Sequence, residues 1–218
     1  MQSIHNYDVY IFDCDGVILN SNQLKIDAME RALRALSFKD EEINQCVNYF
    51  SNNFGRSRFH HVDVFFNDFL PVEENKDTLK SKLLSLFSSQ CKELYLNADV
   101  TPGFISLISS LNGNKYVASG SEQQELRDIF VQRGLDLYFK EIYGSPTPKN
   151  DLVRSILEAE KTTNAVMFGD AVSDFEASKI NEIEFIGYLP YSNVRNKVID
   201  LQLTYQFQII DDFNEVHQ

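Results

Sequence analysis

The stretch "YDVYIFDCDGV" (residues 7–17) decides the fold of this 218-residue chain. It starts with the apolar run 7–12, whose length and composition are typical of a buried strand. The run stops abruptly at two aspartates, Asp13 and Asp15, which are followed closely by Gly16. Two carboxylates this close together repel each other at a cost in free energy. We therefore expect a compensating group beside the end of this strand.

Short apolar runs of the same kind recur in the second half of the chain. They are "KYVAS" (115–119), "EIYGS" (141–145), "NAVMFGD" (164–170), "EFIGYL" (184–189) and "YQFQII" (205–210). Segments with the apolar spacing of helices lie between several of these runs, at 104–112, 122–134 and 150–161. Strands that alternate with helices predict an α/β fold, in which a parallel sheet carries helices on both faces.

Residues 20–96 interrupt this alternation. They contain no convincing strand, and their apolar spacing predicts helices at about 22–36, 41–51, 57–69 and 74–96. Such an insertion is far longer than an ordinary connection between a strand and a helix, which takes about 2–6 residues. We therefore predict an α/β core formed by residues 1–19 and 97–218, and an all-helical insert formed by residues 20–96.

The composition sets limits on the partners of the chain. The formal net charge is −12, from 20 lysines and arginines against 32 aspartates and glutamates. This acidic balance argues against non-specific binding to nucleic acid or to an anionic membrane, because both need basic patches. Apolar stretches are all shorter than the roughly 20 residues that span a bilayer. We expect no nucleic-acid partner and no membrane partner.

The cysteines and the N-terminal segment bear on the compartment. The three cysteines, Cys14, Cys46 and Cys91, are widely spaced, and none forms a C-x-x-C pair. This usage is typical of reduced thiols in a cytosolic protein. The first residues lack the basic and apolar regions of a signal peptide. The sequence therefore predicts a cytoplasmic location.

The predicted sheet would gather charged side chains at one edge. Ligands of open α/β sheets bind beyond the carboxyl ends of the strands. Four aspartates, a serine hydroxyl and a lysine ammonium follow these strand ends: Asp13, Asp15, Ser119, Lys149, Asp170 and Asp174. Several carboxylates at one point need a cation, and a set of hard oxygen ligands favours Mg²⁺ over Zn²⁺.

A metal ion with a lysine and a hydroxyl beside it suits a phosphoryl group. The ammonium of Lys149 and the metal would neutralise its charge, and Ser119 would donate a hydrogen bond to it. A carboxylate that faces the phosphorus can attack it and form an aspartyl-phosphate. A second acid nearby can protonate the leaving alcohol and then deprotonate the incoming water.

This constellation resembles the haloacid dehalogenase superfamily over nearly the whole chain. Residues 13–17 match its first motif, DxDG(V/T), and Ser119 and Lys149 match the second and third. The segment "GDAVSD" (169–174) matches the fourth motif, GDxxxD. The insert resembles the helical C1 cap of the phosphoglycolate phosphatase and β-phosphoglucomutase branch. The resemblance implies a Rossmann-like core with an inserted all-helical cap domain.

The resemblance also implies roles for the motif residues. Asp13 would be the nucleophile and Asp15 the general acid and base. The Asp13 side chain, the Asp15 backbone carbonyl and the Asp170 side chain would bind Mg²⁺. Asp174 would orient a metal-bound water or Lys149.

Within the insert, the segment "NFGRSRFHH" (53–61) concentrates positive charge in an acidic chain. It resembles the G-x-S-R cap loop of the β-phosphoglucomutase branch. We interpret it either as a loop that contacts the distal end of a substrate, including an anionic one, or as a helix start with solvated arginines. The candidate substrate-binding residues are Asn20, Lys25, Arg56, Arg58 and Gly120.

Three alternatives stay open beside phosphomonoester hydrolysis. A β-phosphoglucomutase would carry a cap histidine twelve residues after the nucleophile, where this chain has Lys25. A phosphonate hydrolase uses a cap lysine as a Schiff base, a role in which Lys25 could be cast. A non-catalytic scaffold would bind phosphate or a protein partner without turnover. Asp15 argues against a haloacid dehalogenase, which lacks that acid.

The hypothesis that we adopt is a Mg²⁺-dependent phosphatase that works through a covalent aspartyl-phosphate on Asp13. Its partner would be a small phosphorylated metabolite: a sugar, polyol or amino-alcohol phosphate, or phosphoglycolate. A closed cap would exclude bulk water and large substrates. The sequence leaves the physiological substrate and the oligomeric state open.

Overall fold

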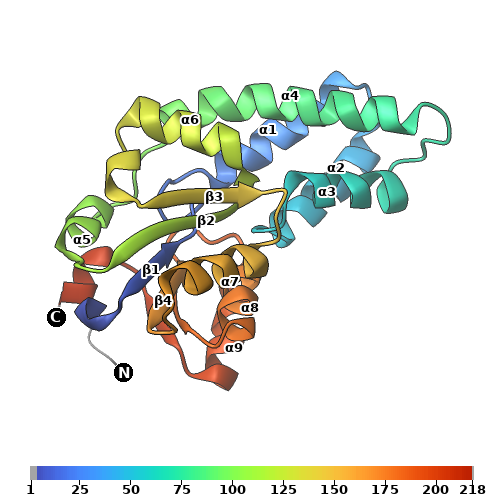
Figure 1. Cartoon of the computed structure of the whole chain (residues 1–218). Coiled ribbons are helices and arrows are strands. Elements are labelled where there is room, and N and C mark those ends of the chain that lie inside the picture. Colours follow the sequence, from blue (N-terminus) through green and yellow to red (C-terminus); the bar gives the residue numbers. More distant parts are fainter. Residues whose placement is uncertain (1–3, 218) are drawn as a thin grey trace.

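A six-stranded parallel sheet forms the centre of the computed structural model, which describes residues 4–217 (Figure 1). Its strands lie in the order β3-β2-β1-β4-β5-β6. Their bounds are β1 (Val9–Phe12), β2 (Asn114–Glu122), β3 (Glu141–Ser145), β4 (Ala165–Gly169), β5 (Glu184–Tyr188) and β6 (Gln208–Ile210). The α/β fold class that the alternation predicted is confirmed.

Strand β1 lies in the middle of the sheet and is buried along its whole length. Val9 pairs with Asn114 on one side and with Ala165 on the other. A central strand that is buried on both faces explains the continuous apolar run before Asp13. Because every pairing between the strands is parallel, the carboxyl ends of all of them lie at the same edge of the sheet.

Helices cover both faces of the sheet. Helices α6 and α7 both contact strands β2 and β3, and Figure 1 shows the two helices on opposite sides of these strands. The helices that accompany the sheet are α5 (Phe104–Ser110), α6 (Gln123–Arg133), α7 (Lys149–Glu160), α8 (Val172–Ile180) and α9 (Arg195–Tyr205). Short helical turns are η1 (Ile4–Asn6), η3 (Asp136–Tyr138) and η4 (Phe213–His217).

The apolar spacing of the sequence did not predict two of these helices, α8 and α9. Helix α8 starts directly behind the fourth motif, and helix α9 buries only Val198, so neither has a strong periodic pattern. The run 205–210 was predicted to be a strand, but Tyr205 ends helix α9 and the strand begins at Gln208.

The insert consists of helices, as its sequence predicts. They are α1 (Asn22–Ala35), α2 (Asp40–Asn52), α3 (Arg58–Val64) and α4 (Lys76–Asn97). The single helix predicted at 57–69 changes to a π-helical turn, η2 (Phe65–Phe69), after α3. The two ends of the insert lie side by side. Leu19 pairs with Val100, and the Asn20 N–H donates to the Asp99 carbonyl (2.9 Å), so the chain leaves and re-enters the core at one place. The division into two domains stays a prediction.

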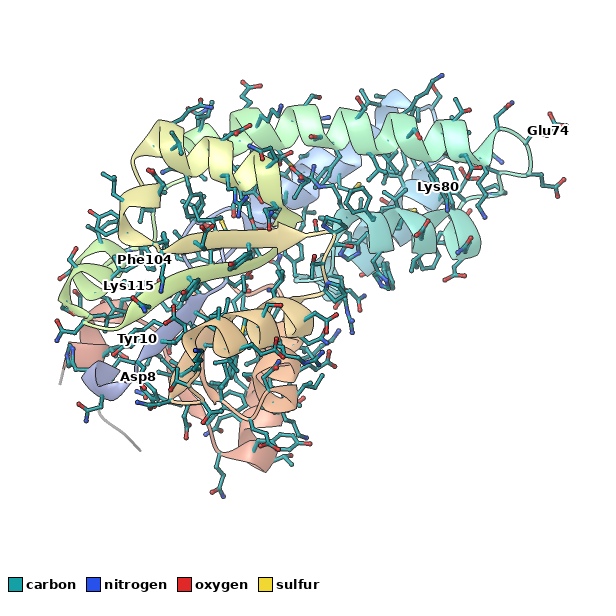
Figure 2. All side chains as sticks on the ribbon, viewed as in Figure 1. Asp8, Tyr10, Glu74, Lys80, Phe104 and Lys115 are labelled. Atoms are coloured by element: carbon teal, nitrogen blue, oxygen red, sulfur yellow. The ribbon has the colours of Figure 1, made fainter. Side chains whose placement is uncertain are left out.

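One end of the insert lies against the core. Helix α4 packs on α6, and the Arg133 guanidinium donates to the Tyr95 carbonyl (2.6 Å). The other end projects away from the sheet, with Glu74 and Lys80 near its tip (Figure 2). No helix among residues 4–217 is both long and apolar enough to cross a membrane.

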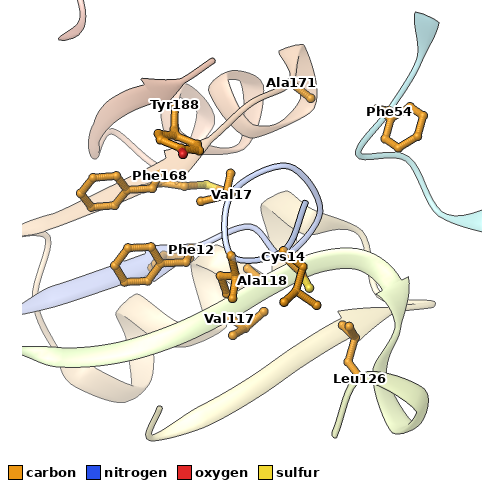
Figure 3. Packing of buried hydrophobic residues seen from close by; sticks show 14 of the residues in the cluster. Phe12, Cys14, Val17, Phe54, Val117, Ala118, Leu126, Phe168, Ala171 and Tyr188 are labelled. Carbon is orange, nitrogen blue, oxygen red and sulfur yellow. The ribbon is translucent and has the colours of Figure 1, made fainter. Parts of the chain in front are cut away.

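Aromatic rings fill the core behind the strand ends. The ring of Phe12 stacks on that of Phe168 on the neighbouring strand, with centroids 4.8 Å apart, and meets Phe104 edge-on (Figure 3). Cys14 lies in the same apolar cluster, and the three cysteines are buried free thiols. The packing of these rings fixes the strand ends that carry Asp13 and Asp170.

Removal of the Phe12 ring is expected to destabilise the protein strongly. Phe12→Ala would lose buried apolar area and leave a cavity between three rings, which lowers the free energy of unfolding by about 3–5 kcal/mol. Urea unfolding measures this loss, and Leu137→Ala, at a side chain that is 85% exposed, is the control. A loss below about 1 kcal/mol for Phe12→Ala would contradict this account of the core.

Candidate active site

Asp13 stands at the end of strand β1, where the chain turns sharply. Its N–H continues the sheet by donating to the Phe168 carbonyl (2.9 Å). The turn that follows needs Gly16, whose φ is +78°. A Cβ at Gly16 would also lie only 2.4 Å from Asp170 Oδ2. The glycine therefore allows the first and fourth motifs to approach each other closely.

Lys149 links Asp13 to Asp174. Its ammonium lies 2.9 Å from Asp13 Oδ1 and also donates a hydrogen bond to Asp174 Oδ1. The other oxygen of Asp174 accepts hydrogen bonds from the backbone N–H groups of Asp170 (3.1 Å) and Ala171 (3.0 Å). Asp174 thus orients Lys149 and holds the turn after strand β4 in place.

Asp170 completes a cluster of carboxylates. Asp13, Asp170 and Asp174 each offer an oxygen within 4.8 Å of the others, and all three side chains are buried. Asp170 Oδ2 accepts a hydrogen bond from the Asn22 amide (2.7 Å), which comes from the start of helix α1. The Asn22 Oδ1 atom is buried without a hydrogen-bond partner.

The electrostatics of this cluster favour a cation. Burial raises the pKa of Asp13 to about 7, with Asp174 and Asp15 adding to the effect and Lys149 opposing it. Burial and the charges of Asp174 and Asp13 also raise the pKa of Asp170. Asp13 Oδ1 is buried and accepts no hydrogen bond, although Lys149 lies close to it. Buried carboxylate oxygens that lack full compensation fit a hard divalent cation such as Mg²⁺.

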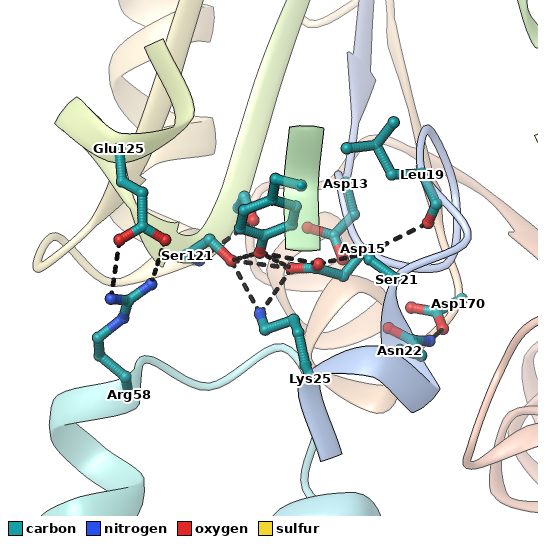
Figure 4. Close-up of polar contacts among 12 residues, drawn as sticks. Asp13, Asp15, Leu19, Ser21, Asn22, Lys25, Arg58, Ser121, Glu125 and Asp170 are labelled. Carbon is teal, nitrogen blue, oxygen red and sulfur yellow. Dashed lines mark hydrogen bonds and ion pairs between the residues drawn. The ribbon is translucent and has the colours of Figure 1, made fainter. Parts of the chain in front are cut away.

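Asp15 occupies a different environment, in a network of hydrogen bonds. Its carboxylate accepts from Ser21 (2.6 Å), Lys25 (2.8 Å), Tyr95 (2.9 Å) and Ser121 (2.8 Å), as Figure 4 shows in part. Burial raises the pKa of Asp15, but the charge of Lys25 and these hydrogen bonds outweigh burial, and the net pKa is lowered. Asp13 and Asp15 are therefore close in sequence but differ in their affinity for a proton.

Strand β2 supplies the second motif. Ser119 is buried, and its hydroxyl accepts a hydrogen bond from the Ser121 N–H (3.1 Å). A Cβ at Gly120 would lie 2.6 Å from the Gly55 carbonyl, so the insert and the core touch backbone to backbone here. The sequence predicted that this strand ends at Ser119. The strand instead continues to Glu122, with a shift of register after Ala118.

The charged residues of segment 53–61 have different environments. Arg58 is buried, and its guanidinium donates to both carboxylate oxygens of Glu125 on helix α6 (2.9 and 3.1 Å). Arg56 is exposed and lies 3.3 Å from Glu176. His61 carries no positive charge, contrary to the sequence interpretation, because burial, with His60, Lys25 and Arg56, lowers its pKa to about 3.

Two cavities adjoin these residues. One of about 250 Å³ opens beside Lys149 and is lined by Arg56, His60 and Thr147, while neither Asp13 nor Asp15 lines it. The other lies on the insert side, where Lys25, Arg58 and Ser121 line it together with the rings of Phe50, Phe54 and Phe87. Its volume is only about 10 Å³, roughly the space that one water molecule needs.

The structure brings Asp13, Lys149, Asp170 and Asp174 together and joins Asp15 to Lys25. Ser119 connects to the Asp15 network through Ser121, and Asn20 lies at the junction with the insert. Sequence reasoning missed four partners of these residues: Ser21, Tyr95, Ser121 and Glu125. Ser121 was recognisable from its place two residues after Ser119. Tyr95 carried no local signal, since the apolar spacing of its helix explains it as a packing residue, and Glu125 is typical of a surface charge on a helix.

Comparison with known proteins agrees with this arrangement. A family model described as haloacid dehalogenase-like hydrolase matches residues 10–188. A search of curated proteins found no match.

Solved structures match nearly the whole chain. A predicted phosphatase from Clostridium acetobutylicum is 19% identical with a TM-score of 0.76, over 97% of this chain and 96% of the other. A predicted phosphoglycolate phosphatase from Haemophilus somnus is 16% identical with a TM-score of 0.79, over 99% and 100%. A β-phosphoglucomutase from Clostridium difficile is 18% identical with a TM-score of 0.68, over 96% and 92%.

At these identities the solved structures establish the fold. The family model goes further, because it spans most of the chain and includes all four motifs. This chain therefore belongs to the haloacid dehalogenase-like hydrolases.

Proposed function

We propose that the protein is a Mg²⁺-dependent phosphatase that hydrolyses a small phosphorylated metabolite through an aspartyl-phosphate on Asp13. One observation carries the proposal: the Asp13 carboxylate lies 2.9 Å from the Lys149 ammonium, within a cluster that includes Asp170 and Asp174. A buried carboxylate held beside a cation, at the strand ends where ligands bind, suits attack on a phosphoryl group.

The side chains around Asp13 have different roles in the proposed reaction. The Asp13 carboxylate attacks phosphorus, and the bond from phosphorus to the alcohol oxygen breaks. Lys149 and the Ser119 hydroxyl bind the phosphoryl oxygens, whose negative charge would otherwise repel the nucleophile. Asp174 holds Lys149 in position. The carboxylates of Asp13 and Asp170 and the backbone carbonyl of Asp15 would hold Mg²⁺, which supplies further neutralisation of phosphoryl charge when bound.

Asp15 fits the proton transfers. Because Lys25 and the hydrogen bonds lower the pKa of Asp15, it must take up a proton before the first step. It would then give this proton to the leaving alcohol, and the resulting carboxylate would take a proton from the water that hydrolyses the aspartyl-phosphate. Each turnover returns Asp15 to its starting form. Ser21, Tyr95 and Ser121 fix the orientation of the carboxylate. Burial and the neighbouring Asp15 charge raise the pKa of Tyr95, so its hydroxyl stays a neutral donor.

The contacts of Lys25 count against the phosphonate hydrolase alternative. A lysine forms a Schiff base only as a neutral amine. Burial lowers the pKa of Lys25, but the charge of Asp15 outweighs burial, and the net pKa is raised. The mutase alternative also loses support, because the position of its cap histidine holds a lysine that is bound to Asp15 and Ser121.

Phosphate release from small phosphomonoesters tests the proposal directly. With Mg²⁺ the wild-type protein is expected to turn over at least one sugar, polyol or two-carbon phosphate. Asp13→Asn would lower kcat by at least about a thousandfold, because it removes the nucleophile. Asp68→Asn, at an exposed position of the insert, is the matched control. Failure of the wild-type protein to release phosphate from every compound would contradict the proposal.

Thermal unfolding with and without Mg²⁺ tests the metal site. At a hundredfold excess over Kd the ion stabilises the folded protein by about 2.7 kcal/mol, which raises the Tm by about 5–10 °C. Asp170→Asn is expected to lose most of this increase. Without Mg²⁺, the same variant is expected to melt at a higher temperature than the wild type, because one repelling carboxylate is gone. Equal Mg²⁺ responses in the two proteins would show that the ion binds elsewhere.

Borohydride trapping separates the phosphonate alternative from hydrolysis. Native protein incubated with a phosphonate aldehyde and borohydride is expected to show no added mass on Lys25, because the amine is protonated and bound to Asp15. Denatured protein is the positive control, since its Lys25 is free to react. A stoichiometric adduct on Lys25 of the native protein would favour the phosphonate hydrolase.

A further inference from the structure

The alcohol part of a substrate has one place to lie if the proposed function holds. It must sit beside Asp15, which exchanges a proton with the leaving oxygen. Lys25 and Ser121 both contact Asp15, and both line the small cavity between the insert and the core. Asp15 itself lines neither cavity, but its partners Lys25 and Ser121 line the small one and not the larger one beside Lys149. On the proposed function, the region of the small cavity is therefore where the leaving group would lie, and it must widen to admit one, because its volume here is only about 10 Å³.

Every charge around the small cavity has a partner. Lys25 is paired with Asp15 (2.8 Å) and Arg58 with Glu125 (2.9 Å), and Arg56 lies 3.3 Å from Glu176 at the surface. The Glu125 carboxylate also accepts a hydrogen bond from Ser88 (2.8 Å). Figure 4 shows both pairs, Arg58–Glu125 and Lys25–Asp15, joined by dashed lines.

The remaining lining is apolar or neutral. The rings of Phe50, Phe54 and Phe87 surround the cavity, and His61 is neutral because burial lowers its pKa. Two buried atoms, Arg58 Nε and His61 Nδ1, have no hydrogen-bond partner within the described residues 4–217. Such atoms suit a hydroxyl group, which can accept one hydrogen bond and donate another.

A charged leaving group would meet a large desolvation cost in this cavity. The Arg58 and Glu125 side chains are 5% and 2% exposed, so the pair lies almost wholly out of contact with bulk solvent. A buried charge without a free counter-ion costs several kcal/mol. Arg58 cannot supply that counter-ion, because its two terminal nitrogens, Nη1 and Nη2, already donate to the Glu125 carboxylate.

We propose that Glu125 cancels the charge of Arg58 and thereby selects phosphomonoesters with a small, uncharged, hydroxyl-bearing leaving group. A second phosphate or a carboxylate on the alcohol would be rejected. The Arg58–Glu125 pair also joins the insert to the core, but a purely structural role predicts no dependence on the charge of the substrate.

Three two-carbon phosphomonoesters test the charge selection in the wild-type protein with Mg²⁺. They are 2-hydroxyethyl phosphate, phosphoglycolate and phosphoethanolamine, which differ mainly in the charge of the distal group. The kcat/KM for the neutral compound is expected to exceed each of the others by at least about tenfold, which corresponds to 1.4 kcal/mol. Preference for either charged compound would overturn the proposal.

Two variants separate charge selection from a structural role. Glu125→Gln leaves Arg58 unpaired, so kcat/KM for phosphoglycolate relative to 2-hydroxyethyl phosphate is expected to rise about tenfold. Arg58→Gln leaves Glu125 unpaired, so the relative value for phosphoethanolamine is expected to rise instead. Glu158→Gln, at an exposed position of helix α7, is the control for the loss of one negative charge. Unchanged ratios in both folded variants would overturn the proposal.

Binding of non-hydrolysable phosphonates distinguishes failure of this inference from failure of the proposed function. Calorimetry would compare 3-hydroxypropylphosphonate with 3-phosphonopropionate on the wild-type protein with Mg²⁺. Tighter binding of the hydroxyl compound, even without turnover of any ester, would support the neutral cavity while contradicting the phosphatase. Turnover of esters with tighter binding of the carboxylate compound would support the phosphatase and overturn the selection by Glu125.

Discussion

Repulsion among buried carboxylates is the constraint on which the rest of this structure depends. The parallel sheet brings Asp13, Asp170 and Asp174 together at one edge, out of contact with water. Lys149 compensates part of this charge, from the start of a helix that follows a different strand. Under the proposed function, a divalent cation at this cluster would lower the free energy of the folded protein, and a phosphoryl group would lie between that cation and Lys149.

Charge compensation also ties the insert to the core. Lys25 and Arg58 belong to the insert, whereas their partners Asp15 and Glu125 belong to the core. Movement of the insert away from the strand ends would separate both pairs, and its return would dry them again. The charges that hold the insert in place are thus the same charges that line the space for the leaving group. If the further inference holds, substrate selection would depend on the same two ion pairs that join the insert to the core.

How much of the structure can be predicted from the sequence depends on how local each sequence signal is. The run before Asp13 predicted a central strand, since a strand buried on both faces is apolar throughout. Helix α9 was missed because it buries little besides Val198. The pairing of Arg58 with Glu125 was equally out of reach, because the two residues are 67 positions apart and each reads as a surface charge on its own helix. Long-range pairs depend on how the insert docks on the core, and that docking leaves no periodic pattern in either segment.

The charge of the whole chain and the charge of the cavity act over different distances. The net charge of −12 raises a weak barrier against any anion, but salt screens it beyond about 8 Å under physiological conditions. Inside the site, the barrier is the desolvation cost of a second anionic group. It acts only at short range and is strong, because the ion pairs around the cavity are buried and complete. In the proposed function, Lys149 and a cation held by the carboxylates would compensate the charge of one phosphoryl group, so that a monophosphate would overcome both barriers. A second anionic group on the same molecule would find no such compensation, so the two barriers together favour substrates with a single phosphate.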